Sequence, residues 1–533
     1  MERDLVTRLQ SHPNLVTSSI KMVADTRRKK LLDFDSIYTL RAKHPNTKLV
    51  HCHGVFDVLH AGHLAYFESA KKFGDILVVT VTADEFVNKG PGRPYFNSAV
   101  RANMLAALEV VDYVVVNRTP TAVSAIEALK PHFYVKGPDY KDKIRDVTGA
   151  IFLEESAVEK HGGKLVFTED EIHSSSTLIN RFFTQWTQEQ TKMIESVQAA
   201  GGYFLIEKIL EKISHEKVGV IGEPIIDNYV FCRPESISSK SPSVSAQYLY
   251  QEDYAGGTLA IANHLCDFVK ETTLITTHGG ESQFENLLNE KLDKRIKLVN
   301  QRLPNIPTPK KTRFIAIEKS QRIFELTDLR FDQWRHHSPK EFCSLLKHHQ
   351  PRFDTTLFAD FGHGLFENSV LETTASLEGF ICVNVQTNSS NFGFNPFKKH
   401  KKFAFLSIDT KEARIAYHDR FTLPLDLARQ MRKDLANTGA SLTMTLGQHG
   451  AFYFPKDNSV EYFSPAFADE VIDPTGAGDA FFALTSLLVK TGCPNPVIPF
   501  LGNVFAGLKT RIIGNKAPVS KAQFIKAVSS ILK

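Results

Sequence analysis

Short apolar runs alternate with amphipathic stretches along the first third of the chain. Runs of this length, rich in β-branched residues, indicate buried strands at Leu77–Val81, Tyr113–Val116 and His132–Val135. The stretches with helical periodicity are Ala99–Glu109 and Thr121–Leu129. Strands that alternate with helices form a parallel sheet wrapped by helices. We therefore expect a first α/β domain over residues 46–183.

The same alternation restarts at the strand Val218–Gly222 and predicts a second, longer α/β domain over residues 215–533. Between the two domains, residues 184–214 are mainly polar with a helical pattern and a break at Gly201-Gly202, so we interpret them as a helical linker or packing arm. Residues 1–45 are polar and helical in pattern and contain no recognised motif, and we expect a helical N-terminal extension there.

Composition limits the class of protein. A chain of 533 residues exceeds one ordinary core, and its net charge of +5 suits small anionic substrates but is too diffuse to indicate nucleic acid. The six cysteines are scattered without close pairs, which is typical of reduced thiols. The N-terminus does not resemble a secretory signal, and no apolar run could span a bilayer. We therefore expect a cytoplasmic protein with no membrane or nucleic-acid partner.

The segment His53-Gly54-Val55-Phe56-Asp57-Val58-Leu59-His60-Ala61-Gly62-His63 lies where a buried strand turns into a helix. His60 and His63 are three residues apart and share a helix face near the positive helix N-terminus. They could therefore present two ring nitrogens to one phosphate. Packing in the core and metal binding are the alternatives; metal is disfavoured because no cysteine or second histidine cluster lies nearby.

A second phosphate motif follows in Asp473-Pro474-Thr475-Gly476-Ala477-Gly478-Asp479, a glycine-rich turn that enters an apolar helix. Backbone N–H groups from Gly476, Ala477 and Gly478 can converge on an anion at the helix N-terminus. Asp479 would lie beside that anion and could take a proton from an attacking hydroxyl group.

The first motif resembles the cytidylyltransferase-like nucleotidyltransferases, whose pattern G-x-F-D-x-x-H-x-G-H is matched at Gly54, Phe56, Asp57, His60, Gly62 and His63. The resemblance covers about residues 46–183 and implies a Rossmann-like domain. It implies catalytic roles for His60, His63 and Lys89. The implied nucleotide- and phosphate-binding residues are Gly54, Phe56, Asp57, Arg93, Arg101, Lys136, Asp139, Ser175, Ser176 and Thr177. For the last three, simple helix capping is the alternative.

The second motif resembles the ribokinase/PfkB-type sugar kinases, over about residues 215–533. The resemblance implies a ribokinase-like α/β domain in which Asp479 is the catalytic base and Gly476, Ala477 and Gly478 bind phosphate. The other implied residues are Thr445, Gly447 and Gly450 for the nucleotide, Asp227, Gly256 and Gly257 for the sugar, and Glu412 and Asp409 for Mg²⁺. Mg²⁺ would enter with ATP or another nucleoside triphosphate.

Together, the two resemblances point to a bifunctional sugar kinase and nucleotidyltransferase of the ADP-heptose synthase type, with the domains in reversed order. Such an enzyme would use nucleoside triphosphates and sugar phosphates, with ATP favoured, and make an activated sugar for a surface glycan. The resemblance also allows a homodimer. The alternatives are a cytidylyltransferase for a polyol or other sugar phosphate, and an active nucleotidyltransferase whose kinase-like part only binds or dimerises.

Three departures from the heptose-kinase branch bear on the substrate. Ala260 stands where that branch has a sugar-binding asparagine, Asp409 replaces another asparagine, and Asn384-Val385-Gln386-Thr387 replaces an Asp-Pro-Lys segment. The resemblance therefore implies an altered sugar or a weakened kinase.

Overall fold

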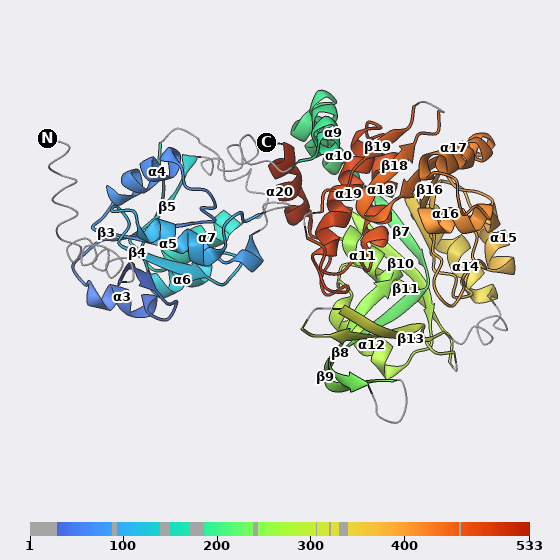
Figure 1. Ribbon diagram of the computed structural model, residues 1–533, viewed down its shortest axis with the longest axis horizontal. Coiled ribbons are helices and arrows are strands. Elements are labelled where there is room, and N and C mark those ends of the chain that lie inside the picture. Colours follow the sequence, from blue (N-terminus) through green and yellow to red (C-terminus); the bar gives the residue numbers. More distant parts are fainter. Residues whose placement is uncertain are drawn as a thin grey trace. The chain divides into compact units, whose positions relative to one another are not determined.

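The computed structural model describes most of the chain. The described residues are 29–87, 93–138, 150–169, 186–237, 243–304, 306–318, 321–329, 339–457, 460–468 and 470–532. The chain divides into two compact units, Met1–Gln185 (unit 1) and Trp186–Leu532 (unit 2) (Figure 1). Among the described residues, none of the helices is both long enough and apolar enough to cross a membrane.

Unit 1 is built on a parallel sheet whose described strands have the order β1-β4-β3-β2-β5-β6. The strands are β1 (Leu31–Leu32), β2 (Leu49–Gly54), β3 (Ile76–Thr82), β4 (Tyr113–Asn117), β5 (Phe133–Lys136) and β6 (Lys164–Phe167). The helices are α3 (Ile37–Lys43), α4 (Ala61–Lys71), α5 (Ser98–Ala106), α6 (Val123–Leu129) and α7 (Ala150–Lys160). The predicted strands and helices are thus present, and the predicted α/β class is confirmed.

Helices cover both faces of this sheet because successive strand side chains point to opposite sides. In β3, Leu77 and Val79 pack with residues of α4 and α5, whereas Val78 packs with residues of α3 and α6. This burial on both faces is the reason that most residues of β3 are apolar.

The order of the strands determines where a ligand can bind. From β2 the chain runs outward through β3 and β4, then returns to place β5 on the other side of β2. Ligands of such sheets bind at the carboxyl ends of the strands where the order reverses. The histidine motif follows β2, so it lies at this position.

Of the helical N-terminal extension expected over residues 1–45, the structure describes residues 29–45, which contain the helix α3. Leu31 and Leu32 form the edge strand β1, which pairs with β4. Leu32, Phe34 and Ile37 pack against residues of β4 and α6. The described part of the extension therefore belongs to the α/β fold of unit 1, because its apolar side chains cover that edge of the sheet.

Unit 2 contains a sheet whose described strands have the order β11-β10-β7-β14-β15-β16-β17-β18-β19. The strands are β7 (Lys217–Gly222), β10 (Glu271–His278), β11 (Lys297–Arg302), β14 (Thr355–Asp360), β15 (Phe380–Val385), β16 (Phe405–Asp409), β17 (Ser441–Thr445), β18 (Ala451–Phe454) and β19 (Tyr462–Ser464). The strands from β11 to β17 pair in parallel, and β18 and β19 are added antiparallel.

Two apolar clusters cover the two faces of this sheet. Leu357 and Ala359 of β14 face the cluster that contains α18, α19 and α20, and Phe358 faces the cluster that contains α14 and α15. The helices of unit 2 are α9 (Gln188–Ala199), α10 (Gly202–Ile213), α11 (Thr258–Leu265), α12 (Ser282–Lys291), α14 (Lys340–His349), α15 (Asn368–Ser376), α16 (Thr410–Tyr417), α17 (Pro424–Asp434), α18 (Ala477–Lys490), α19 (Val497–Thr510) and α20 (Lys521–Leu532).

A smaller sheet, with the order β13-β12-β8-β9, extends from one end of unit 2 (Figure 1). Its strands are β8 (Pro224–Ile237), β9 (Val244–Gly257), β12 (Lys310–Ala316) and β13 (Gln321–Asp328). The first part of β8, from Pro224 to Cys232, is buried, and the remainder is exposed. The buried part carries Asp227 next to the larger sheet.

Residues 184–214 contain the two expected helices, α9 and α10, separated at Gly201. Of the two interpretations of this segment, the structure favours the packing arm. Val197, Ile206 and Leu210 are buried in the main apolar cluster of unit 2, so the helices are part of that fold.

Candidate active sites

The histidine pair of unit 1 lies at the N-terminus of α4. His60 is the N-cap residue with extended backbone, and its carbonyl accepts a hydrogen bond from the backbone N–H of His63 at 2.9 Å. The two rings stack with centroids 3.9 Å apart and planes 27° apart. The structure therefore brings the two predicted side chains together at a helix N-terminus, where an anion is favoured.

Phe56 and Gly54 shape the turn behind these rings. Phe56 has a φ of 49°, and its ring meets the His63 ring edge-on with centroids 5.5 Å apart. A Cβ on Gly54 would lie 3.0 Å from Phe56 Cζ. Glycine at position 54 therefore leaves room for the close approach of this ring.

Asp57, which belongs to the histidine motif, lies close to Arg93. Asp57 is buried, and its carboxylate accepts hydrogen bonds from the backbone N–H groups of Tyr95 at 2.8 Å and Phe96 at 3.0 Å. Arg93 Nη1 lies 3.7 Å from Asp57 Oδ2. Burial lowers the pKa of Arg93, and the Asp57 carboxylate opposes that shift. Asp57 thus holds the segment that carries Arg93 against the histidine motif.

Arg101 is placed differently from the expected phosphate-binding position. Its side chain is fully buried and donates to the carbonyl oxygens of Phe96, Val55 and Thr82 at 2.6–2.8 Å. It also forms an ion pair with Asp84 at 2.6 Å. These bonds direct the guanidinium into the protein, so the structure corrects the prediction: Arg101 ties the histidine turn to the end of β3.

We expect Arg101→Met to lower the free energy of unfolding of unit 1 by about 2–5 kcal/mol, because three carbonyl groups, of which that of Thr82 is buried, lose their donor and the Asp84 carboxylate loses its ion-pair partner. Chemical denaturation followed by circular dichroism measures this change. Arg118→Met, at an exposed position of the same unit, is the matched control. Equal stability of the two variants would contradict the structural role of Arg101.

Lys136 ends β5, the strand next to β2, and is buried. Its ammonium group lies 3.0 Å from Glu154 Oε2, and the same carboxylate accepts hydrogen bonds from the Tyr134 hydroxyl and the backbone N–H of Ala122. The structure thus places Lys136 near the predicted site but in a buried ion pair.

Sequence reasoning missed two further histidines beneath the site. His51 Nε2 and His53 Nδ1 each lie 2.8 Å from Thr80 Oγ1. Burial lowers the pKa of both histidines to about 3, so both rings are neutral at physiological pH. Their spacing of two residues on a strand puts them on one face, which is the signal that could have identified the pair. The predicted residues Lys89, Asp139, Ser175, Ser176 and Thr177 lie outside the described residues.

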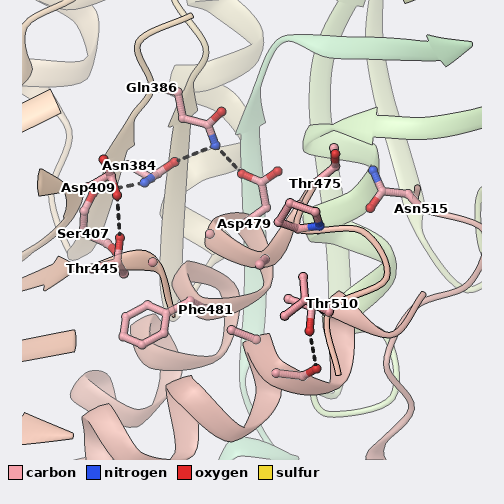
Figure 2. A pocket seen from close by; sticks show the side chains of 18 of the residues that line it. Asn384, Gln386, Ser407, Asp409, Thr445, Thr475, Asp479, Phe481, Thr510 and Asn515 are labelled. Atoms are coloured by element: carbon pink, nitrogen blue, oxygen red, sulfur yellow. Dashed lines mark hydrogen bonds between the residues drawn. The ribbon is translucent and has the colours of Figure 1, made fainter. Parts of the chain in front are cut away.

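Unit 2 contains a cavity of about 800 Å³ at the carboxyl ends of its central strands (Figure 2). All but one of the predicted residues of this unit line the cavity: Asp227, Gly257, Asp409, Glu412, Thr445, Gly447, Gly450, Gly476, Ala477, Gly478 and Asp479. The exception is Gly256, where an added Cβ would lie 2.6 Å from Asp227 Oδ2. Gly256 therefore leaves room for the Asp227 carboxylate.

Asp479 lies in the first turn of α18 and points into the cavity (Figure 2). Gln386 Nε2 donates a hydrogen bond to Asp479 Oδ1. Burial raises the pKa of Asp479 to about 6; the Gln386 hydrogen bond opposes this shift and the charge of Asp227 adds to it. A carboxyl group with this pKa is suited to accept a proton near neutral pH.

The glycine-rich turn before Asp479 has the geometry of an anion site. Gly476 is the N-cap of α18 with a φ of 80°, a conformation that favours glycine. As at the start of every α-helix, the first backbone N–H groups have no acceptor one turn earlier within the helix. The N–H of Ala477 donates to the Pro474 carbonyl at 3.2 Å, whereas those of Gly478 and Asp479 belong to residues that line the cavity and are placed to bind a phosphate group.

Asp227 is held by a cationic side chain of β12. Arg313 forms a buried ion pair with Asp227, and its Nε lies 3.1 Å from Glu325 Oε2. Lys311, on the same strand, also lines the cavity and is mostly buried. Burial lowers the pKa of Lys311, while the charges of Asp227 and Asp479 oppose that shift. Lys311 and Arg313 are thus cavity residues that the predicted site did not include.

Asp409 and Glu412, the predicted Mg²⁺ ligands, form a capping box at the N-terminus of α16. Glu412 Oε2 accepts the backbone N–H of Asp409 at 2.8 Å, and Glu412 Oε1 accepts that of Thr387 at 2.9 Å. Burial raises the pKa of both carboxyl groups, that of Glu412 to about 8. No group of three or more potential metal ligands occurs in the described part of the chain. A buried acidic pair still fits Mg²⁺, which is usually bound by one or two carboxylates together with phosphate groups.

Comparison with known proteins defines the class of each unit. Residues 51–182 match the Cytidylyltransferase-like family, and residues 404–491 match the pfkB family carbohydrate kinase. The chain therefore combines a region similar to the cytidylyltransferase-like family with a region similar to the pfkB carbohydrate kinases, and both resemblances predicted from the motifs are confirmed.

The curated relatives carry a more particular name. Bifunctional protein HldE of Campylobacter fetus is 43% identical over 129 residues, which are 24% of this chain and 27% of that protein. Bifunctional protein HldE of Helicobacter pylori (strain Shi470) is 35% identical over 164 residues, which are 30% of this chain and 33% of that protein. The matches thus span only about a quarter to a third of the relatives' length.

Solved structures were also found to be similar. Arabidopsis thaliana ribokinase, complexed with ribose and ATP, has a TM-score of 0.46 and 16% identity over 60% of this chain and 99% of that chain. Phosphofructokinase-2 from Escherichia coli has a TM-score of 0.48 and 12% identity over 60% of this chain and 100% of that chain.

Proposed function

We propose that the protein is a bifunctional enzyme that phosphorylates a sugar phosphate with ATP and joins a sugar 1-phosphate to a nucleotide. The main support is the cavity of unit 2, where a buried carboxylate of raised pKa lies beside a glycine-rich helix N-terminus. The histidine pair at the reversal point of the sheet in unit 1 supports the second activity.

In the kinase step, a sugar hydroxyl oxygen attacks the γ-phosphorus of ATP. The new oxygen–phosphorus bond forms as the bond to the β,γ-bridging oxygen breaks, and ADP leaves with that electron pair. Asp479 Oδ2 takes the hydroxyl proton, because Oδ1 is occupied by Gln386. The backbone N–H groups at the start of α18 stabilise the charge on the transferring phosphoryl group. Glu412 and Asp409 would hold the Mg²⁺ that neutralises ATP.

In the nucleotidyl transfer, a phosphate oxygen of the sugar 1-phosphate attacks the α-phosphorus of the nucleoside triphosphate, and pyrophosphate leaves. No covalent enzyme intermediate is required, so alignment and charge stabilisation dominate the catalysis. His60 and His63 are placed to bind the reacting phosphate together, because their stacked rings share the N-terminus of α4.

The cationic residues of β12 favour an acceptor that already carries a phosphate group. Lys311 and Arg313 border the cavity together with Asp227, so one wall offers both a hydrogen-bond acceptor for hydroxyl groups and positive charge. Ala260, buried in α11, supplies no polar group. We therefore infer a phosphorylated sugar of the heptose phosphate type whose hydroxyl contacts differ from those implied by the heptose-kinase resemblance.

The resemblance to ADP-heptose synthase favours ATP as the nucleotide donor, whereas the family name Cytidylyltransferase-like favours CTP. A screen of sugar phosphates and sugar 1-phosphates with each nucleotide separates these possibilities. ADP release reports the kinase, and pyrophosphate release reports the nucleotidyltransferase. Absence of both products with every sugar phosphate would refute the proposal. Pyrophosphate without ADP would leave only the nucleotidyltransferase.

The pH dependence of ADP release tests the role of Asp479. Protonation of this base abolishes its function, so we expect kcat to fall as the pH drops through about 6. Because the Gln386 hydrogen bond lowers the pKa of Asp479, Gln386→Leu is expected to move this acidic limb to higher pH. Gln430→Leu, at an exposed position on α17, is the control. An unchanged limb in Gln386→Leu would contradict the assignment.

A further inference from the structure

The packing arm at the start of unit 2 reaches the cavity of that unit. The chain enters unit 2 at Trp186, and α9 begins directly after its N-cap residue, Thr187. α9 lies against α19, α20 and β19 (Figure 1). The arm lies outside residues 404–491, which match the pfkB family, and the proposed reaction steps do not use it. Its first turn nevertheless contacts a segment that borders the cavity.

The contacted segment comprises residues 464–468, which begin at the last residue of β19. Ala466 and Ala468 of this segment line the cavity. Gly450, which is predicted to bind the nucleotide and lines the same cavity, packs directly on it: a Cβ on Gly450 would lie 2.1 Å from the carbonyl oxygen of Ser464. We therefore call residues 464–468 the nucleotide wall.

Phe467 fixes the nucleotide wall to the core. Its side chain is buried, and its ring packs against that of Trp186 with centroids 5.6 Å apart and planes 64° apart. On α19, the ring of Phe500 meets it edge-on with centroids 5.1 Å apart. Because Ala466 and Ala468 flank Phe467, a shift of the Phe467 ring would displace both cavity residues. Trp186 thus supports the wall through its buried ring.

Gln190 holds the backbone of the nucleotide wall. Its Nε2 donates a hydrogen bond to the carbonyl oxygen of Ala466 at 2.7 Å. From α19, the side-chain amide of Asn503 donates to the carbonyl oxygens of Ser464 at 2.8 Å and Pro465 at 3.2 Å. Three consecutive carbonyl groups of the wall are therefore bound by side chains from two different helices, one of which belongs to the packing arm.

We propose that Trp186 and Gln190 are positioning residues for the nucleotide in the kinase site, because they hold the nucleotide wall in the shape that receives it. This inference rests on the proposed function of unit 2. A wall that is fixed before the nucleotide arrives does not have to be ordered on binding, so the entropy cost of ordering it is avoided. The packing arm is therefore part of the kinase site, although Trp186 and Gln190 do not line the cavity themselves.

Steady-state ADP release by the full-length chain tests the role of Trp186. We expect Trp186→Ala to raise the KM for ATP about tenfold, and to leave kcat and the KM for the sugar phosphate within about twofold, because the reacting groups keep their places. Trp186→Phe keeps an aromatic ring against Phe467 and should retain the KM for ATP of wild type within about twofold. Lys192→Met, at an exposed position of α9, is the control.

Gln190→Glu separates positioning from helix stability. Glutamate keeps the Oε1 that accepts the backbone N–H of Thr187, and it is a favoured residue at this position of a capping box. It replaces the donor to the Ala466 carbonyl with a second acceptor. We therefore expect the Tm to stay within about 2 °C of wild type, while the KM for ATP rises about tenfold.

ADP binding provides a measurement that requires no sugar. The chain contains two tryptophans, Trp186 and Trp334, so the difference in fluorescence between wild type and Trp186→Phe isolates the emission of Trp186. We expect ADP with Mg²⁺ to change this emission until the site is saturated. In Gln190→Glu, measured against its own Trp186→Phe counterpart, the midpoint of the titration should move to about tenfold higher ADP.

The outcomes distinguish this inference from the proposed function. If Trp186→Ala and Gln190→Glu both leave the KM for ATP within about twofold of wild type, the arm serves stability alone and the inference is overturned. An emission of Trp186 that ADP does not change would overturn it as well. If ADP changes the emission and Gln190→Glu moves the midpoint, but wild type releases no ADP with any sugar phosphate, the positioning role is supported and the kinase function fails.

Discussion

Asp479→Asn is expected to reduce ADP release by about 10²- to 10⁴-fold, because the amide cannot accept the proton of the attacking hydroxyl. The substitution keeps the size of the side chain, and the new amide oxygen can still accept the hydrogen bond that Gln386 donates. ATP binding should change little, since the backbone N–H groups of the glycine-rich turn remain. The loss should therefore appear in kcat more than in the KM for ATP.

Two controls make this result specific. Pyrophosphate release by Asp479→Asn should stay within about twofold of wild type, because that reaction takes place in unit 1. Glu372→Gln neutralises an exposed carboxylate of α15 and should leave ADP release unchanged. If Asp479→Asn kept more than about a tenth of the wild-type kcat, Asp479 would not be the base.

The parts of the sites that could be predicted from the sequence are those formed by neighbouring residues. His60 and His63 meet because they occupy adjacent turns at one helix end, and Asp479 follows its phosphate turn directly. In both cases the spacing along the chain determines the distance in space, since an N-cap turn leads directly into the first turn of the helix.

Partners that meet through the tertiary fold could not be predicted in this way. Gln386 reaches Asp479 because β15 ends beside the N-terminus of α18, although 93 residues separate them. Arg101 resembles a family arginine in its position after the loop, yet four acceptors around the histidine turn bind its guanidinium. A motif predicts which part of the fold a residue occupies. Whether its side chain contacts a ligand or other protein groups depends on the tertiary packing.

Tertiary packing also determines the structure of two segments whose local sequence pattern is weakly informative. The apolar residues of α9 and α10 looked sparse beside the polar ones, but those few cover the core of unit 2. Likewise, Leu31 and Leu32 are too short an apolar run to predict a strand. They form a strand because they pair with the edge of β4. Each of these segments adopts its structure by packing or pairing with residues that are distant in the sequence, so its local pattern alone could not predict it.

His63→Ala is expected to reduce pyrophosphate release by about 10²- to 10³-fold, as is usual when one group that stabilises a transition-state charge is removed. His60 alone would then contact the reacting phosphate, and the N-terminus of α4 would lose one of its two ring donors. ADP release should remain within about twofold of wild type, because Asp479 and its turn lie in unit 2.

The His63 ring also packs edge-on against Phe56, so a general loss of structure has to be separated from a loss of chemistry. His63→Gln keeps a polar side chain of similar length and should retain the thermal stability of unit 1, yet lose pyrophosphate release to a similar extent. His161→Ala, on the turn after α7, is the control within the same unit. If pyrophosphate release in His63→Gln matched that of His161→Ala, the ring would serve packing alone, and the transferring phosphate would have to be stabilised by other groups.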